Sequence, residues 1–121
     1  MSLDIYFYDK QGEEVESQVD LNITHNLNTI VEECGKVWNR RHYELVWRPD
    51  ELFGFPNGKV PVRNILLRLP TLIEDLIDNE LELRKFLPQN GWGTYEGLIS
   101  FLCDYLKECY KNKNGFVYCC R

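Results

Sequence analysis

Apolar and polar residues alternate over the N-terminal part of the chain. Residues 3–8 are a dense apolar and aromatic run that ends at the turn-forming segment 9–12. From Val15 to Ile23 every second residue is apolar, broken only by Ser17. Because side chains on a strand point alternately to opposite faces, this period predicts a strand with one buried face. The short connection between the two runs predicts an antiparallel hairpin.

Helical spacing of apolar residues follows in three segments, 27–40, 64–87 and 94–111. In the second segment Pro70 removes an amide donor, so we expect the helix to break just before it. In the third segment Glu108 is expected to lie on the solvent face, opposite an apolar stripe.

The remaining segments complete the expected fold. Residues 43–62 contain several prolines and glycines and are expected to be mostly loop, with a short helical turn at 49–53. The aromatic and β-branched residues at 116–121 predict a final strand. This order predicts a single α+β domain over residues 1–121, in which three to four helices pack on a small antiparallel sheet made of the N-terminal hairpin and the C-terminal strand.

Composition agrees with one domain of ordinary size. The chain has 121 residues, of which 44% are hydrophobic and 27% charged. No apolar run approaches the roughly 20 residues of a membrane span, and the first residues lack the pattern of a secretion signal. We therefore expect a cytoplasmic protein that does not associate with membranes.

The net charge of −5 is unevenly distributed along the chain. Residues 1–35 carry −7, residues 36–68 carry +4 and residues 69–121 carry −2. The basic middle segment also contains several aromatic residues, so it could hold a small anion or a phosphate group. The alternative is that its bases pair with the acidic residues on either side of it.

Cysteine usage does not suggest a metal site. The five cysteines contain no CxxC spacing, and His25 and His42 lie far from them in the sequence. We expect reduced and mostly buried cysteines, with no metal and no cofactor.

A first group of polar residues ends the second predicted strand. Asn22 and Thr24 point to the same strand face, and Asn26 follows at the corner before the helix. Amide and hydroxyl groups beside a helix N-terminus can bind an anion, or they can simply cap the helix. Candidate caps for that helix are Asn26, Asn28 and a capping box of Thr29 and Glu32.

Two further segments carry candidate ligand-binding residues. In the segment 88–94, Asn90 precedes Gly91, Trp92 and Gly93, and the glycines allow positive φ angles or a close approach to a ligand. Trp92 either fills the core or stacks on a ligand. Trp47 and Arg48 place an indole beside a guanidinium, which suits a planar or phosphorylated molecule.

The sequence lacks the common catalytic motifs, including GxSxG, the Walker loop, GxGxxG and HExxH. Adjacent acids on its helices are typical of a solvated face. No catalytic residue is therefore assigned, and an enzyme is not favoured.

Three segments together resemble a group of small proteins encoded by bacteriophages and prophages. They are residues 22–26 (Asn-Ile-Thr-His-Asn), 47–51 (Trp-Arg-Pro-Asp-Glu) and 88–95 (Pro-Gln-Asn-Gly-Trp-Gly-Thr-Tyr). The resemblance spans most of the chain, and residues 34–46 depart from it. It implies a viral origin and the host cytoplasm as location, but no particular reaction.

The leading hypothesis is a non-enzymatic protein that captures a nucleotide-like or other phosphorylated small molecule, such as a host immune signal, in an anti-defence role. The residues expected to bind it are Asn22, Thr24, Asn26, Trp47, Arg48, Asn90, Gly91, Trp92 and Gly93. One alternative is an inhibitor that binds a host defence protein or a nucleic-acid enzyme through its acidic surface. Another is a nucleotide hydrolase or transferase. Direct nucleic-acid binding is not expected, and homo-oligomer formation is left open.

Overall fold

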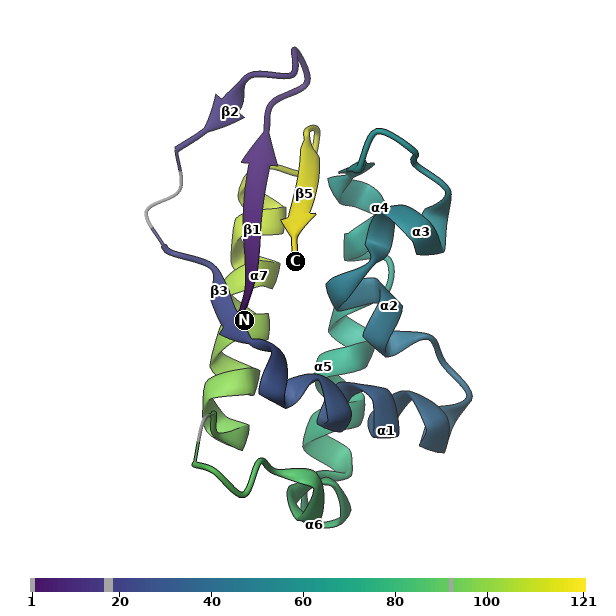
Figure 1. Ribbon diagram of the computed structural model, residues 1–121. Coiled ribbons are helices and arrows are strands. Elements are labelled where there is room, and N and C mark those ends of the chain that lie inside the picture. The colour runs from purple at the N-terminus through teal and green to yellow at the C-terminus, as the bar shows by residue number, and fades with distance from the viewer. Residues whose placement is uncertain (1, 17–18, 92) are drawn as a thin grey trace.

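The computed structural model describes residues 2–16, 19–91 and 93–121, and within these ranges the chain is an α+β protein (Figure 1). Its five strands form one sheet in which every pairing is antiparallel. The strands are β1 (Ser2–Tyr8), β2 (Glu14–Val15), β3 (Asn22–Thr24), β4 (Lys59–Pro61) and β5 (Phe116–Cys120). The predicted α+β fold class and the N-terminal antiparallel hairpin are confirmed. The expected three to four helices were too few, because the described residues form seven α-helices, several of them too short to show a helical period in the sequence, and the sheet also contains β3 and β4.

The predicted strand from 15 to 23 is divided into two short strands. β2 pairs with the end of β1, and β3 pairs with its beginning, so both lie along one edge of β1 while β5 occupies the other. Between them Val19 is 37% exposed, so the apolar face of this segment is not buried continuously. The prediction of one strand was wrong because alternation alone does not show where pairing is interrupted.

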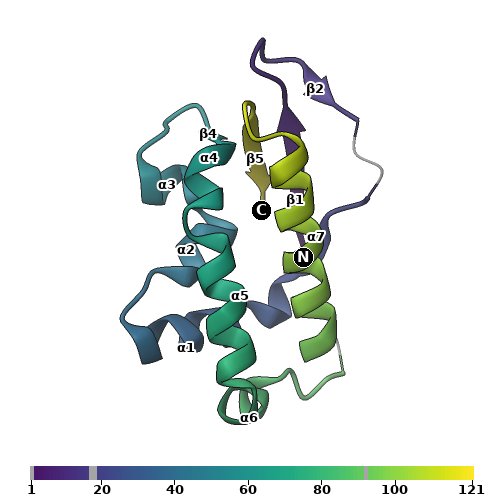
Figure 2. The ribbon, with the colours of Figure 1, turned by 180° about the vertical axis from the view of Figure 1, so that it is seen from behind.

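Helices cover one face of the sheet. Leu3, Ile5 and Phe7 of β1 point toward the helices and are buried, whereas Tyr6 is exposed on the other face. The long helix α7 runs along the inner face of β1 and β5, as both views show (Figures 1 and 2). The helices are α1 (Asn28–Trp38), α2 (His42–Trp47), α3 (Pro49–Phe53), α4 (Val62–Leu66), α5 (Leu69–Asp78), α6 (Glu80–Leu83) and α7 (Tyr95–Lys111), with 3-10 turns η1 (His25–Leu27) and η2 (Arg84–Phe86).

Local signals determine where several helices begin. Pro70 lies in the first turn of α5, which confirms the predicted break. Thr24 caps η1, where its hydroxyl oxygen accepts a hydrogen bond from the Asn26 amide at 3.3 Å. η1 leads directly into α1, and no side chain caps α1. The predicted caps within 26–32 are therefore not used.

Glu108 corrects the expected outer face of α7. It is only 4% exposed, and Lys111 lies 3.4 Å from its carboxylate. The buried face of α7 is wider than its apolar stripe because this helix packs against both the sheet and the pair α4 and α5 (Figure 2). Among the described residues, no helix is both long and apolar enough to cross a bilayer.

Candidate anion-binding site

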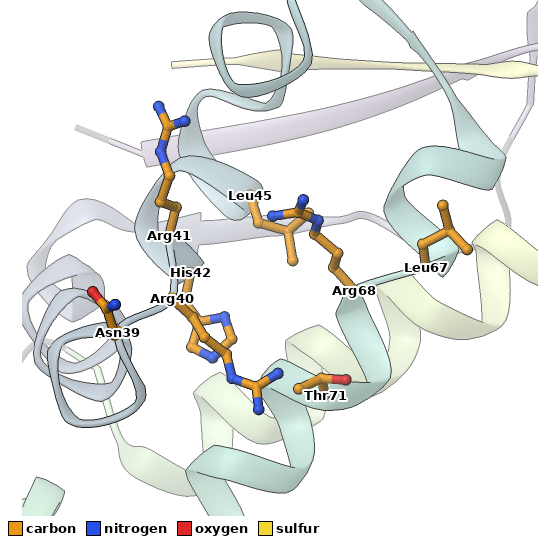
Figure 3. A pocket seen from close by; sticks show the side chains of 8 residues that line it. All are labelled: Asn39, Arg40, Arg41, His42, Leu45, Leu67, Arg68 and Thr71. Atoms are coloured by element: carbon orange, nitrogen blue, oxygen red, sulfur yellow. The ribbon is translucent and has the colours of Figure 1, made fainter.

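A cavity of about 280 Å³ lies where the end of α1, the beginning of α2 and the junction of α4 with α5 meet (Figure 3). Two segments separated by more than 20 residues form it. Its lining residues are Asn39, Arg40, Arg41, His42, Leu45, Leu67, Arg68 and Thr71. Three arginines therefore surround one concavity, and all three belong to the basic middle segment of the sequence.

A tight turn after α1 forms one wall. Asn39 adopts the left-handed conformation with φ 53°, and the Arg40 amide donates to the Gly35 carbonyl at 2.8 Å. The chain folds back so closely that a Cβ at Gly35 would lie 2.4 Å from the Arg40 carbonyl oxygen. Gly35 thus permits the turn that brings Arg40 to His42 beside the cavity, a role that the sequence pattern did not indicate.

His42 and Asp75 form a buried polar pair that joins α2 to α5. The His42 Nε2 and Asp75 Oδ2 atoms are 2.7 Å apart, and the residues are 4% and 7% exposed. Burial lowers the pKa of His42 from its ordinary value of 6.5, and nearby Arg40 and Arg68 also lower it, while the bond to Asp75 opposes them. The imidazole is therefore neutral near pH 7, and the positive charge at the cavity is on the arginines.

The guanidinium groups of Arg40 and Arg68 approach the cavity from opposite walls. In Figure 3 Arg40 extends toward Thr71 and Arg68 toward Leu45. The Arg40 Nε atom is 3.5 Å from Asp75 Oδ2, and the side chain is 48% exposed. Within the described part of the chain Arg68 has no carboxylate partner, and its guanidinium lies 5.5 Å from the centre of the Phe53 ring.

Arg41 contributes less directly to this cavity. It forms an ion pair with Glu44, and in Figure 3 its side chain extends away from Arg40 and Arg68. Two guanidinium groups with the Thr71 hydroxyl and the Asn39 amide nearby are suited to an anion, because a guanidinium offers several donors in a planar fork that matches phosphate oxygens.

Three of the seven bases of the middle segment pair with acids three residues away. Lys36 pairs with Glu33, Arg41 with Glu44, and Arg48 with Glu51. Within the described residues, the acidic stretch 1–35 contributes only Glu33 to these pairs. From the acidic part that follows, Asp75 pairs with Arg40. Acids on either side of the basic segment therefore form two of the four ion pairs that its bases make among the described residues, so the alternative accounts for part of its charge and leaves Arg68 outside these pairs.

A third side chain joins the His42–Asp75 pair. The Cys34 Sγ atom, a ring nitrogen of His42 and a carboxylate oxygen of Asp75 all lie within 4.8 Å of one another, and all three residues are buried. Burial raises the pKa of the Cys34 thiol to about 12, so it is protonated at neutral pH. Spacing along the chain did not suggest this cluster, since its members come from three helices.

The first predicted polar segment serves strand pairing and capping in the structure. The Asn22 amide nitrogen donates to Ser2 Oγ at 3.0 Å and to Asp4 Oδ1 at 2.6 Å on the adjacent strand. Thr24 and the Asn26 backbone form the cap of η1. Of the two roles predicted for this segment, anion binding and helix capping, the contacts of Thr24 and Asn26 agree with capping, at η1 instead of α1.

Trp47 and Arg48, the predicted indole and guanidinium pair, lie in different environments: Trp47 is in the core and Arg48 is at the surface. Trp47 is 1% exposed, and Tyr43 stacks on it with ring centres 5.5 Å apart. The edge contact with His25 covers the indole further, so it has no exposed face on which a ligand could stack. Arg48 is half-buried and pairs with Glu51.

The glycine-rich segment has the backbone conformation expected of it. Gly91 and Gly93 have φ angles of 76° and 103°. A Cβ at Gly93 would lie 2.9 Å from Leu27 Cγ, so here the close approach is to the core. Asn90 is exposed, and Trp92 lies outside the described residues. None of the eight described residues that the sequence predicted for binding lines the basic cavity.

Comparisons of the chain with protein-family models, with curated proteins and with solved structures gave no match.

Proposed function

We propose that this protein binds a small phosphorylated molecule in the cavity between Arg40 and Arg68. The observation that carries the proposal is that two arginine side chains, 28 positions apart in the sequence, line one concavity from opposite walls (Figure 3). Arg68 supports it most strongly, because its charge is not matched by a described carboxylate. The proposal concerns binding and assigns no reaction.

The size of the cavity favours a compact ligand. Its volume of about 280 Å³ lies just below the roughly 300–1,000 Å³ typical of sites for drug-sized molecules. A phosphate or pyrophosphate group fits this space, and the rest of a nucleotide-like ligand would extend beyond the cavity. With the neutral His42 donating from Nε2 to the Asp75 carboxylate, its Nδ1 can only accept a hydrogen bond, for example from a hydroxyl group of the ligand.

Arg40 can bind the anion without losing its present partner. Its Nε faces Asp75, and a guanidinium has further N–H groups that remain free to donate. The buried Asp75 carboxylate thereby orients Arg40 as well as His42. An anion beside both arginines would relieve their mutual repulsion, and this gain would decrease as salt screens the charges.

Calorimetric titration with inorganic phosphate, pyrophosphate and adenosine diphosphate tests the proposal. We expect binding by at least one of these probes, weakened by added salt. Arg68→Ala should reduce the affinity by roughly 10- to 100-fold, since a hydrogen bond to a charged group contributes about 1.5–3 kcal/mol. The matched control is Arg63→Ala, which removes the same charge from an exposed arginine of α4 that bonds to Asn114 outside the cavity.

The results separate this cavity from the site predicted by sequence. Equal losses in the Arg68 and Arg63 variants would show that only overall charge matters and would contradict a defined site. Loss of binding in Arg48→Ala with full binding in Arg68→Ala would place the ligand at the Trp47–Arg48 segment instead. No heat with any probe, from protein whose circular dichroism shows it to be folded, would overturn the proposal.

A further inference from the structure

Three buried side chains with metal-binding atoms meet behind the wall of the basic cavity. Cys34 comes from α1, His42 from α2 and Asp75 from α5. Their ligand atoms all lie within 4.8 Å of one another, and the three residues are 0%, 4% and 7% exposed. Within the described residues this is the one such group of three.

These atoms are already close to the spacing that a zinc ion requires. Ligands bound to one tetrahedral zinc at roughly 2.0–2.3 Å lie roughly 3.3–3.8 Å from one another. His42 Nε2 and Asp75 Oδ2, at 2.7 Å, would move apart, and the most distant pair would close by about 1 Å. Shifts of this size need side-chain rotation and no change of fold.

The ligand set also suits zinc chemically. Thiolate, imidazole and carboxylate are the three side-chain types that bind Zn²⁺, and sites with three protein ligands leave a fourth position for water. One thiolate and one carboxylate balance the two charges of the ion. Of the three residues, His42 also lines the basic cavity, so the cluster lies next to that cavity.

We propose that Cys34, His42 and Asp75 bind a zinc ion. Binding replaces the proton of the Cys34 thiol by the metal, and this proton is released to solvent. His42 stays neutral, because the proton on Nε2 moves to Nδ1 by exchange with solvent and leaves Nε2 to bind the ion. Arg40 lies 3.5 Å from the Asp75 carboxylate and must turn away from the ion, which it can do because its side chain is 48% exposed. The zinc ligands are not the arginines that hold the anion, so the zinc proposal does not require phosphate binding, although zinc would displace Arg40 from Asp75.

The competing explanation is that the cluster is purely structural. In that case Cys34 is a small apolar core residue and His42 and Asp75 are a satisfied hydrogen-bonded pair. Only a metal site requires sulfur at position 34. An assay that detects a metal–thiolate bond therefore distinguishes the two explanations, and stability measurements alone do not.

The test uses the full chain, freed of metal with a chelator and titrated with Zn²⁺ and, separately, Co²⁺ in phosphate-free buffer. We expect one ion per chain, release of one proton, and a thiolate-to-cobalt charge-transfer band in the near ultraviolet. Cys34→Ser should abolish the band and weaken zinc binding by on the order of 100-fold. Cys120→Ser, which changes an exposed thiol, is the matched control and should leave both unchanged.

Asp75→Asn is the second variant, because its amide oxygen can still accept the hydrogen bond from His42 and preserve the fold if the serine variant does not fold. It should weaken zinc binding while the protein keeps its wild-type circular dichroism. Absence of the cobalt band in the wild-type protein would overturn the proposal. So would zinc affinity that is unchanged in either cluster variant, or a band lost with Cys120 and kept without Cys34.

Discussion

At residue 35 the absence of a side chain lets two parts of the backbone meet. Gly35 lies inside α1, where glycine is usually unfavourable, yet a Cβ there would be 2.4 Å from the carbonyl oxygen of Arg40. The close contact is with backbone, which cannot rotate away as a side chain can. Residue 35 therefore determines how near the Arg40 turn lies to α1.

We predict that Gly35→Ala destabilises the protein by about 1–3 kcal/mol, because overpacking at this contact outweighs the gain in helix propensity. Urea unfolding followed by circular dichroism measures this change. Glu32→Ala, at an exposed position of the same helix, is the control and should change stability by less than about 0.5 kcal/mol. A Gly35 variant at least as stable as wild type would show that the turn can shift at little cost.

The candidate site was predictable from the sequence as a charge pattern but not residue by residue. The excess of bases in 36–68 predicted either an anion site or pairing with the acids on either side, and Arg40 and Arg68 both belong to that segment. Arg40 and Arg68 line the cavity because the chain turns at Asn39 and because α5 packs nearby. These are long-range features that no local sequence pattern predicts. Trp47 was a candidate for stacking on a ligand because it precedes Arg48, but its indole is buried in the core.

At the scale of elements, α7 begins at a side-chain cap. The Thr94 hydroxyl oxygen accepts a hydrogen bond from the Gly97 amide at 2.9 Å, at the start of a helix of 17 residues that packs along the sheet. This bond satisfies one of the amides that a helix leaves without a partner at its N-terminus.

We predict that Thr94→Ala lowers the free energy of unfolding by about 1 kcal/mol and Tm by roughly 3–5 °C. Thermal unfolding by calorimetry measures it, and Thr94→Ser, which keeps the hydroxyl, should recover most of the loss. Ser100→Ala at an exposed position of α7 is a second control and should not destabilise. A serine variant as unstable as the alanine variant would show that the cap does not explain the effect.

The elements that the sequence predicted well are those long enough to show a period. The segments 27–40 and 94–111 correspond to α1 and α7, and Pro70 marked the break before α5. α2 has six residues and β4 has three, so neither spans enough turns or alternations to stand out from a loop. Their positions are set by packing against α1 and β5, which local sequence does not encode.

At the scale of the whole molecule, one hydrophobic cluster contains residues from nearly every element. It joins Phe7 of β1, Trp47 of α2, Leu72 of α5 and Tyr105 of α7, all nearly inaccessible to solvent. Phe7 and Tyr105 meet edge to face with ring centres 6.2 Å apart, which connects the sheet directly to α7. With such a shared core, no group of elements keeps its buried surface if the others unfold.

We therefore predict a single cooperative unfolding transition, in which tryptophan fluorescence and far-ultraviolet circular dichroism change at the same urea concentration. Of the three tryptophans, Trp47 is buried in the core, Trp38 is 45% exposed on α1, and Trp92 lies outside the described residues. The fluorescence of Trp47 reports on the loss of the core, whereas circular dichroism reports on all helices. Trp38→Phe should sharpen the fluorescence change without moving the midpoint. If the fluorescence midpoint came clearly before that of circular dichroism, the helices around the basic cavity would be a separate unit that opens first, and the single-domain interpretation would be wrong.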